Sequence, residues 1–177
     1  MDETPDQTAQ WPCQIFGHLK RVRVSQVGYV PDAGHSRLIQ LCRDDAQIHD
    51  VVLTTEEEGV GLACGAALAG ERAVLLMQSS GVGNCINAFS LLKSCGFSCL
   101  VLVTMRGEFA EFNSWQVPMG SITQDCLRLC GFVVMRAEHE DEVDDIAGAA
   151  CDMAFDGLTP VALLLSQRLI GRKKWLK

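Results

Sequence analysis

Six short runs of apolar residues, each about as long as one β-strand, alternate along this chain with longer segments of helical character. The runs are rich in Val and Leu, and they lack the polar alternation of a half-exposed strand, which is typical of parallel strands buried on both faces. They lie near Val27–Val30, Val51–Leu53, Ala73–Met77, Cys99–Thr104, Phe132–Met135 and Val161–Leu165. The sequence therefore predicts a six-stranded, mostly parallel sheet.

Helical patterns fill the intervals between these runs. The expected helices are about Pro12–Val22, His35–Asp45, Glu56–Ala69, Val82–Lys93, Ser121–Cys130 and His139–Phe155. Repeated strand–helix–strand units imply right-handed crossovers with helices on both faces of the sheet. With 177 residues, we expect a single three-layer α/β domain over residues 11–170. Residues 1–10 are expected to form a disordered segment and residues 171–177 a basic tail.

Charge and residue usage exclude several classes of protein. A net charge of −7 argues against a nucleic-acid surface. The longest apolar runs are strand-sized, too short to cross a membrane, and no signal peptide opens the chain. The nine cysteines are odd in number and several lie in apolar runs, which favours buried, reduced thiols in a cytoplasmic protein. No Cys-x-x-Cys pair occurs and the four histidines are scattered, so we expect no metal site within the chain.

Ligands of open parallel sheets lie beyond the carboxyl ends of the strands. Four loops follow those ends here: residues 31–34, 54–58, 78–84 and 105–120. In the second loop, Thr55 and Glu58 fit a helix capping box, and capping also accounts for Glu57. Glu56 stands at the junction of strand and helix, where its carboxylate can project into a cleft. The following helix is rich in Gly and Ala, which suits close packing on the sheet, on a ligand or on another subunit.

The third and fourth loops carry glycines and a cation. Residues 78–84, Gln-Ser-Ser-Gly-Val-Gly-Asn, could hold an anion through free N–H groups or could be a tight turn. Dinucleotide binding is disfavoured because Ile86 occupies the third glycine position of that fingerprint, and the chain has no Gly-Lys-Ser/Thr. In the fourth loop, the guanidinium of Arg106 suits an oxyanion. The alternative is a surface pair with Glu108.

Together these residues resemble the pyrimidine-binding (PYR) domain of thiamine diphosphate enzymes. The resemblance covers about Phe16 to Leu165, and the nearest branch contains the sulfopyruvate decarboxylase alpha subunit and phosphonopyruvate decarboxylase. Its pattern is a glutamate before a Gly/Ala-rich helix, a strand, and then Gln-(Asn/Ser)-Ser-Gly-x-Gly-Asn. Tyr29–Asp32 and the Arg-Gly-Glu followed by Gln116–Gly120 match the same branch. Residues 113–116 depart from the phosphonopyruvate decarboxylase form, which favours the sulfopyruvate branch.

The resemblance assigns roles to residues of this chain. It makes Glu56 the catalytic glutamate, hydrogen-bonded to the pyrimidine ring nitrogen N1′ of the cofactor. Substrate contacts are expected from Asp32, His35, Arg106 and Gln116. The residues expected to line the cofactor are Glu56, Gln78, Ser79, Ser80, Gly81, Gly83 and Asn84.

The resemblance also implies a partner. Enzymes of this kind hold the diphosphate and Mg²⁺ with a Gly-Asp-Gly motif on a second, PP domain, and this sequence has no such motif. We therefore expect a hetero-oligomer with a beta subunit that carries the PP domain. The expected reaction is decarboxylation of 3-sulfopyruvate, a small anionic 2-oxo acid, to sulfoacetaldehyde. The alternatives are phosphonopyruvate or another 2-oxo acid as substrate, or a non-catalytic PYR-like subunit with an assembly or regulatory role.

Overall fold

Six parallel strands form the centre of the protein, which a computed structural model describes from residue 9 to residue 171. They lie in the order β2-β1-β3-β4-β6-β5, and every neighbouring pair is parallel. Their bounds are β1 Gln26–Tyr29, β2 His49–Val52, β3 Ala73–Gln78, β4 Leu100–Thr104, β5 Val133–Ala137 and β6 Val161–Leu165. Each strand overlaps a predicted run, with ends at most two residues away, so the predicted sheet is confirmed.

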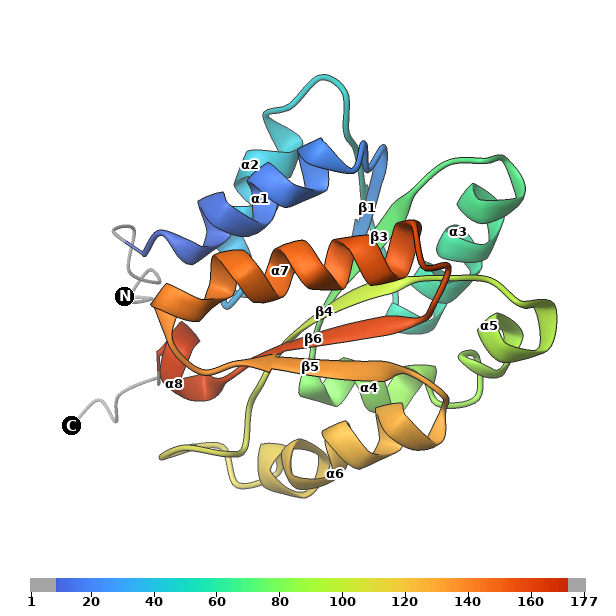
Figure 1. The fold of residues 1–177 in the computed structure, drawn as a ribbon. Coiled ribbons are helices and arrows are strands. Elements are labelled where there is room, and N and C mark those ends of the chain that lie inside the picture. The colour runs from blue at the N-terminus through green and yellow to red at the C-terminus, as the bar shows by residue number, and fades with distance from the viewer. Residues whose placement is uncertain (1–8, 172–177) are drawn as a thin grey trace.

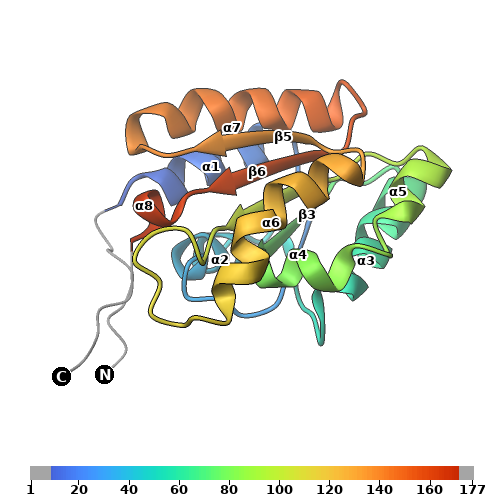
Figure 2. The ribbon, with the colours of Figure 1, turned by 90° about the horizontal axis from the view of Figure 1, so that it is seen from below.

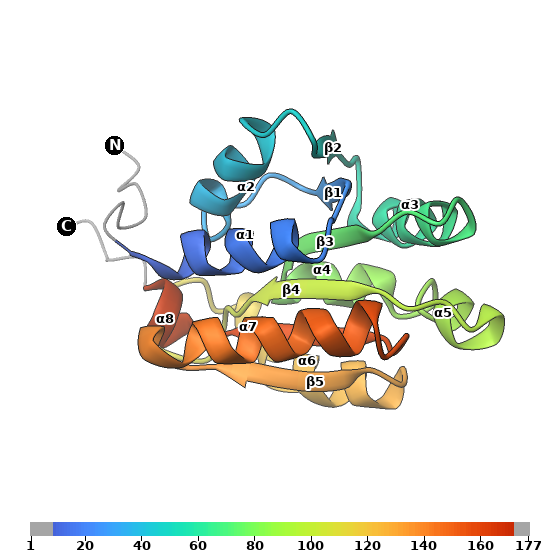
Figure 3. The same ribbon diagram turned by 45° about the horizontal axis from the view of Figure 1, so that its top comes forward.

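Helices cover both faces of this sheet, which confirms the predicted three-layer α/β domain. Figures 1 and 3 show α1, α2 and α7 over one face, and Figure 2 shows α3, α4 and α6 beneath the other. Among the described residues the helices are α1 Trp11–Arg21, α2 Ser36–Arg43, α3 Glu56–Leu68, α4 Ser79–Cys85, α5 Ser90–Cys95, α6 Gln116–Leu129, α7 Glu140–Phe155 and α8 Gln167–Ile170. No helix within residues 9–171 is long and apolar enough to cross a membrane.

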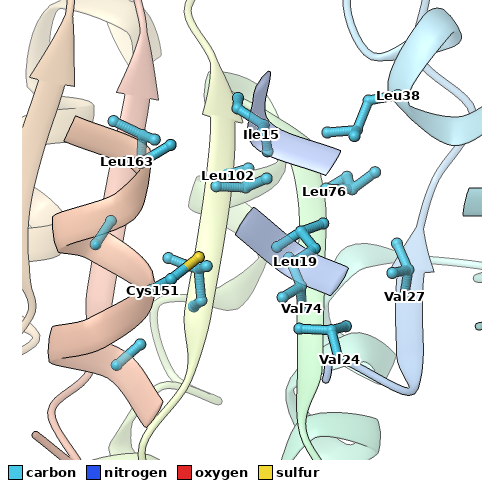
Figure 4. Packing of buried hydrophobic residues seen from close by; sticks show 14 of the residues in the cluster. Ile15, Leu19, Val24, Val27, Leu38, Val74, Leu76, Leu102, Cys151 and Leu163 are labelled. Carbon is cyan, nitrogen blue, oxygen red and sulfur yellow. The ribbon is translucent and has the colours of Figure 1, made fainter. Parts of the chain in front are cut away.

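Two apolar cores lie on the two faces of the sheet because alternate strand residues point to opposite sides. The first core joins the sheet to α1, α2 and α7, and Figure 4 shows part of it: Ile15, Leu19, Val24, Val27, Leu38, Val74, Leu76, Leu102, Cys151 and Leu163. The second core joins the sheet to the other layer of helices, and Phe89 and Phe132 meet edge to face there at 4.8 Å between ring centroids.

Most of the two predicted terminal segments, residues 1–8 and 172–177, lies outside the described residues. Gln10 is the N-cap of α1, and its backbone N–H donates to the side chain of Glu140 at the start of α7. The described chain is therefore anchored to the fold from Gln10 onward.

Two helix predictions differ from the structure. The single helix expected over Val82–Lys93 is divided into α4 and α5, and α4 begins at Ser79 within the stretch read as a loop. Gly81 and Gly83 therefore lie in a helix, and neither has the left-handed backbone that glycine-rich loops use. The last helix of this layer, α6, begins at Gln116, five residues earlier than predicted. Pro118 does not prevent this start, because it falls in the first turn, where a backbone N–H has no partner within the helix.

Close packing on the sheet explains one glycine of the small-residue helix α3. A Cβ on Gly59 would lie 2.9 Å from the side chains of Leu53 and Leu75, so α3 approaches β3 closely. Gly61 and Gly65 differ, since a Cβ at either would meet no heavy atom within 4 Å. Packing on its own sheet therefore accounts for Gly59 and not for the outer glycines.

Candidate active site

The carboxyl ends of β1, β3 and β4 are joined through one carboxylate. Asp32, which follows β1, accepts a hydrogen bond from the Gln78 amide at the end of β3. Its other oxygen accepts from the Thr104 hydroxyl of β4 at 2.7 Å. Burial alone would raise the pKa of Asp32, but nearby His35 and the bonds from Thr104 and Gln78 lower it below the ordinary value. Asp32 is thus an ionised group fixed at the edge of the sheet.

His35 lies beneath this edge with no exposed surface. Its Nε2 lies 3.1 Å from the carbonyl oxygen of Leu102, while its buried Nδ1 has no hydrogen-bond partner. Burial lowers the pKa of the imidazole despite the neighbouring Asp32 carboxylate, so the ring is neutral and donates its Nε2–H to Leu102. This placement makes His35 a buried support for the Asp32 loop, away from an open substrate surface.

Glu56 is the first residue of α3, and its carboxylate faces α4. The Asn84 side-chain amide donates to Glu56 Oε2 at 2.7 Å. A Cβ on Gly81 would lie 2.7 Å from the Glu56 carboxyl carbon and from Oε1. Glycine at position 81 therefore lets α4 come into contact with the carboxylate, and the amide of Asn84 fixes its orientation.

The other two glutamates remain with the helix end. Glu58 Oε2 accepts the backbone N–H of Thr54 at 2.8 Å. The predicted capping box is wrong, because the Thr55 side chain makes no capping hydrogen bond and Glu58 accepts the backbone N–H of Thr54 instead of that of Thr55. Glu57 is exposed at the surface. Of these three carboxylates, only that of Glu56 accepts a hydrogen bond from α4, the helix that contains the glycine-rich stretch.

The start of α4 is tied to the neighbouring segments through Ser79. Its buried hydroxyl accepts the backbone N–H of Arg106 at 3.1 Å. Its carbonyl accepts from the Thr123 hydroxyl of α6 at 3.4 Å. One turn along, a Cβ on Gly83 would lie 3.1 Å from the sulfur of Met119. Ser79 therefore faces the interior, whereas Ser80 is half-buried and Gly83 and Asn84 are exposed along the outer side of α4.

Arg106 has a different partner from either of the two predicted for it. Its Nε and Nη2 donate to the two carboxylate oxygens of Glu111 at 2.6 and 2.5 Å. Glu108, the alternative partner, pairs instead with Arg136 of β5. The Arg106 side chain is 11% exposed and that of Glu111 is 2% exposed. Glu111 thus binds the Arg106 guanidinium through two hydrogen bonds, in the way that a substrate oxyanion was expected to bind it.

Glu111 organises the loop after β4, and sequence reasoning did not single it out. Besides Arg106, it accepts from the backbone N–H groups of Gly107 and Asn113 and from the Gln167 side chain of α8. Burial disfavours its charged form, but these bonds outweigh burial and lower the pKa of Glu111 to about 2. The Gln167 oxygen accepts two further N–H groups of the loop, those of residues 108 and 109. The loop is therefore rigidly attached to α8.

Gln116 begins α6 directly after this loop. Its side-chain oxygen is buried without a hydrogen-bond partner. Gly107 has a left-handed backbone, φ +80°, and packs against the Gln116 carbonyl, where a Cβ would not fit. An unpaired buried acceptor costs about 1–3 kcal/mol. Among the predicted substrate residues, Gln116 and His35 each retain one buried polar atom without a hydrogen-bond partner.

Relatives with an assigned activity share much of this sequence, although no protein-family model matches it. The chain is 36% identical over 143 residues to the sulfopyruvate decarboxylase subunit alpha of Methanococcus maripaludis, covering 80% of this chain and 86% of that one. Identity to the subunit of the same name from Methanocaldococcus jannaschii is 33%, over 85% and 89% of the two chains. The chain belongs to the sulfopyruvate decarboxylase alpha-subunit family.

Two longer proteins are also similar to this alpha-subunit family member, one in sequence and one in fold. A phosphonopyruvate decarboxylase of Streptomyces viridochromogenes is 35% identical over 118 residues, which are 66% of this chain and 30% of that protein. In fold, the chain is similar to 2-oxoglutarate:ferredoxin oxidoreductase from Magnetococcus marinus, with a TM-score of 0.70 and 12% identity, over 93% of this chain and 31% of that one. The chain thus spans about a third of each of these two proteins.

The groups around Glu56 in this alpha-subunit family member fit the pyrimidine side of thiamine diphosphate. The half-buried carboxylate can hydrogen-bond a ring nitrogen while Asn84 holds its other oxygen. Glycine at 81 leaves the carboxylate room that any Cβ would fill. Within residues 9–171, no three His, Cys, Asp or Glu side chains are grouped to hold a metal ion.

Proposed function

We propose that residues 11–170 are the pyrimidine-binding domain of a thiamine diphosphate-dependent sulfopyruvate decarboxylase, in which this chain acts as the alpha subunit. The reaction is the conversion of 3-sulfopyruvate to sulfoacetaldehyde and carbon dioxide. The observation that carries the proposal is the Glu56 carboxylate, held by Asn84 at 2.7 Å and accommodated by Gly81. Membership of the alpha-subunit family supports the choice of substrate.

Glu56 is the catalytic group of this proposal. When bound, thiamine diphosphate supplies the electron sink that holds the electron pair left by carbon dioxide. Glu56 binds the pyrimidine nitrogen N1′ and holds the proton shared with that nitrogen, a general acid–base task. Asn84 keeps the carboxylate in one orientation, and Gln78, Ser80 and the surface of Gly83 line the same side of the cofactor. Ser79 acts from the interior by fixing the start of α4 on Arg106.

A beta subunit completes the site in this proposal. It carries the PP domain with the Gly-Asp-Gly motif, and it holds Mg²⁺ and the diphosphate. The relatives named subunit alpha support a partner of this kind. The complex is a hetero-oligomer in the cytoplasm.

The partner also supplies the positive charge that binds the substrate sulfonate. Arg106 is the one basic residue in the four predicted loops, and Glu111 occupies its guanidinium. At the same edge, Arg136 of β5 pairs with Glu108 and Arg168 of α8 lies over the Phe109 ring. A free sulfonate competes poorly with a buried carboxylate that also accepts three other donors. On this chain, the unpaired oxygen of Gln116 and the ionised Asp32 are hydrogen-bond acceptors, which do not bind an anion.

Phosphonopyruvate is the second candidate substrate, favoured by the 35% identity to a phosphonopyruvate decarboxylase. The test is carbon dioxide release by the chain reconstituted with its beta subunit, thiamine diphosphate and Mg²⁺, on sulfopyruvate, phosphonopyruvate and pyruvate. We expect the highest kcat/KM on sulfopyruvate and none of this activity with either subunit alone. Preference for phosphonopyruvate would change the substrate, and full activity of the alpha chain alone would refute the two-subunit arrangement.

A further inference from the structure

The loop that follows β4 presents two large aromatic side chains at the surface. Phe109 is 39% exposed, and Trp115, the last residue before α6, is 73% exposed. Figure 2 shows this loop projecting beyond the ends of the strands, between α8 and the start of α6. An exposed tryptophan combines a large apolar ring with a polar N–H, and it is among the residue types most enriched in the energetic centres of protein interfaces.

Hydrogen bonds hold this loop in place before any partner binds. Glu111 accepts two backbone N–H groups of the loop, and Gln167 of α8 accepts two more. Next to Trp115, the backbone N–H of Gln116 donates to the carbonyl of Asn113 at 2.9 Å. A surface that is already ordered loses little conformational entropy on binding, so more of its contact energy appears as affinity. Trp115 therefore lies on a preformed surface.

Trp115 belongs to the rim of the candidate active site. Its backbone angles, φ −71° and ψ −13°, are helical, so Met119, four residues on, lies on the same side of α6. A Cβ on Gly83 of α4 would lie 3.1 Å from the Met119 sulfur. The residue after Gly83 is Asn84, which binds the Glu56 carboxylate. One turn of α6 and one residue of α4 therefore separate Trp115 from the group that holds Glu56.

The active site remains open at this edge of the sheet. In the proposed function, on which this inference rests, the beta subunit brings the diphosphate and Mg²⁺ to the cofactor ring that Glu56 binds. Within residues 9–171, Asn84 is the one group that donates a hydrogen bond to the Glu56 carboxylate, and no cluster of metal ligands is present. The carboxyl ends of parallel strands lie at one edge, so Glu56 after β2 and the loop after β4 share it. A subunit that reaches Glu56 therefore also meets this loop.

An unpaired cation at this edge indicates what the partner presents beside the tryptophan. Arg106 and Arg136, at the same edge, each pair with a carboxylate of this chain. Arg168 of α8 is exposed, and its guanidinium lies 4.5 Å from the centre of the Phe109 ring. It has no carboxylate partner among residues 9–171. A cation fixed over an aromatic ring is complementary to an apolar surface that carries a carboxylate.

From these observations we propose that Trp115 anchors the beta subunit on this chain, with Phe109 and Arg168 in the same docking surface. The beta subunit supplies an apolar pocket for the indole ring and a carboxylate for the guanidinium. Bound in this way, it closes the open side of the Glu56 site. The tryptophan acts on assembly and takes no part in the chemistry of the cofactor.

The test is binding of the beta subunit, the chain with the Gly-Asp-Gly motif, to the full alpha chain, measured by isothermal titration calorimetry at low and high salt. We expect Trp115→Ser to raise the dissociation constant on the order of 100-fold, as truncation of an interface anchor does. Arg168→Gln should raise it about fivefold and weaken its dependence on salt, because an ion pair is lost. Leu158→Ser is the matched control: Leu158 is 71% exposed and lies between α7 and β6, at the opposite edge of the sheet. It should leave the dissociation constant unchanged.

Circular dichroism and urea unfolding establish that each variant is folded, and carbon dioxide release is measured in parallel at saturating beta subunit. A wild-type complex that forms without decarboxylating sulfopyruvate would refute the proposed function, and the dissociation constants would still decide the docking surface. Absence of beta-subunit binding at about 100 µM would overturn the proposal. So would a Trp115→Ser chain that binds no more weakly than Leu158→Ser does. If Trp115→Ser changes only the mass of the alpha chain alone, in sedimentation equilibrium, a second copy covers the tryptophan and docking of the beta subunit there is refuted.

Discussion

Gly81→Ala separates the catalytic contact of Glu56 from the stability of the fold. The added Cβ would lie 2.7 Å from the Glu56 carboxyl group. Moving that group by about 0.7 Å restores ordinary contact, since van der Waals contact begins at 3.4 Å. Glu56 has a flexible side chain and can make this movement, but it then loses its 2.7 Å bond to Asn84.

The expected effect on activity is large. A misplacement of about 1 Å in a catalytic group can lower the rate on the order of 100-fold. The effect on folding is small, because alanine is about 1 kcal/mol more favourable than glycine in a helix and this gain opposes the local crowding. We therefore expect kcat of the reconstituted enzyme to fall about 100-fold, while the free energy of unfolding in urea changes by less than about 1 kcal/mol.

Gly17→Ala in α1 is the control, since a Cβ there meets no heavy atom within 4 Å. It makes the same substitution in a helix on the opposite face of the sheet, and it should raise stability without changing kcat. If Gly81→Ala keeps kcat within about threefold of wild type, a change under 1 kcal/mol in barrier height, then contact between α4 and Glu56 does not control catalysis and the reasoning fails.

Three further predictions concern buried ionisable groups. Arg106→Ala and Glu111→Gln should each lower the free energy of unfolding by about 3 kcal/mol, because each leaves a buried partner unpaired; urea unfolding at neutral pH checks this, and losses under about 1 kcal/mol would contradict it. The pKa of Glu111, lowered from 4.5 to about 2, adds stability above pH 4.5 that is lost as pH falls toward 2, and Glu111→Gln should lack this loss. The pKa of His35 is lowered by burial, so stability should fall below pH 6.5 by up to about 1.4 kcal/mol per pH unit. His35→Gln, whose amide can still donate to Leu102, should remove that slope between pH 6.5 and 5.5; an unchanged slope would show that His35 is not its source.

The sheet was predictable because its strands are uninterrupted runs of Val and Leu. β3 and β6 coincide with Ala73–Met77 and Val161–Leu165 to within one residue. Position alone showed only that Glu56, as the first residue of its helix, could project into a cleft. The family resemblance then separated Glu56 from the two glutamates of the first turn. Glu56 and Glu58 lie as that argument requires.

The partner of Arg106 was not predictable, because the network around it joins residues far apart in the chain. Glu111 bonds to Gln167, 56 positions away, across an irregular loop without periodicity. The burial of His35 likewise depends on how the Asp32 loop closes over β4, which no local pattern specifies. A guanidinium in a loop at the strand ends suggests a site for a bound anion. In this protein the anion is the carboxylate of Glu111, which pairs with Arg106.

Short helices rich in glycine were the other source of error. Residues 79–81 read as a loop before the helix predicted from Val82, because glycine disfavours helix, yet packing of α4 against α3 and α6 makes them helical. A helix predicted from Ser121 also left Gln116 and Pro118 in a loop, although α6 begins at Gln116.

The central claim, that Glu56 is the catalytic carboxylate, is tested most directly by Glu56→Gln in the chain reconstituted with its beta subunit. The amide keeps the size of the side chain and removes its ability to hold a proton. We predict that sulfopyruvate decarboxylation falls by about 10²–10⁴-fold, with assembly and urea stability unchanged. Turnover equal to wild type in the assembled Glu56→Gln complex would contradict the account and leave the chain with an assembly or regulatory role.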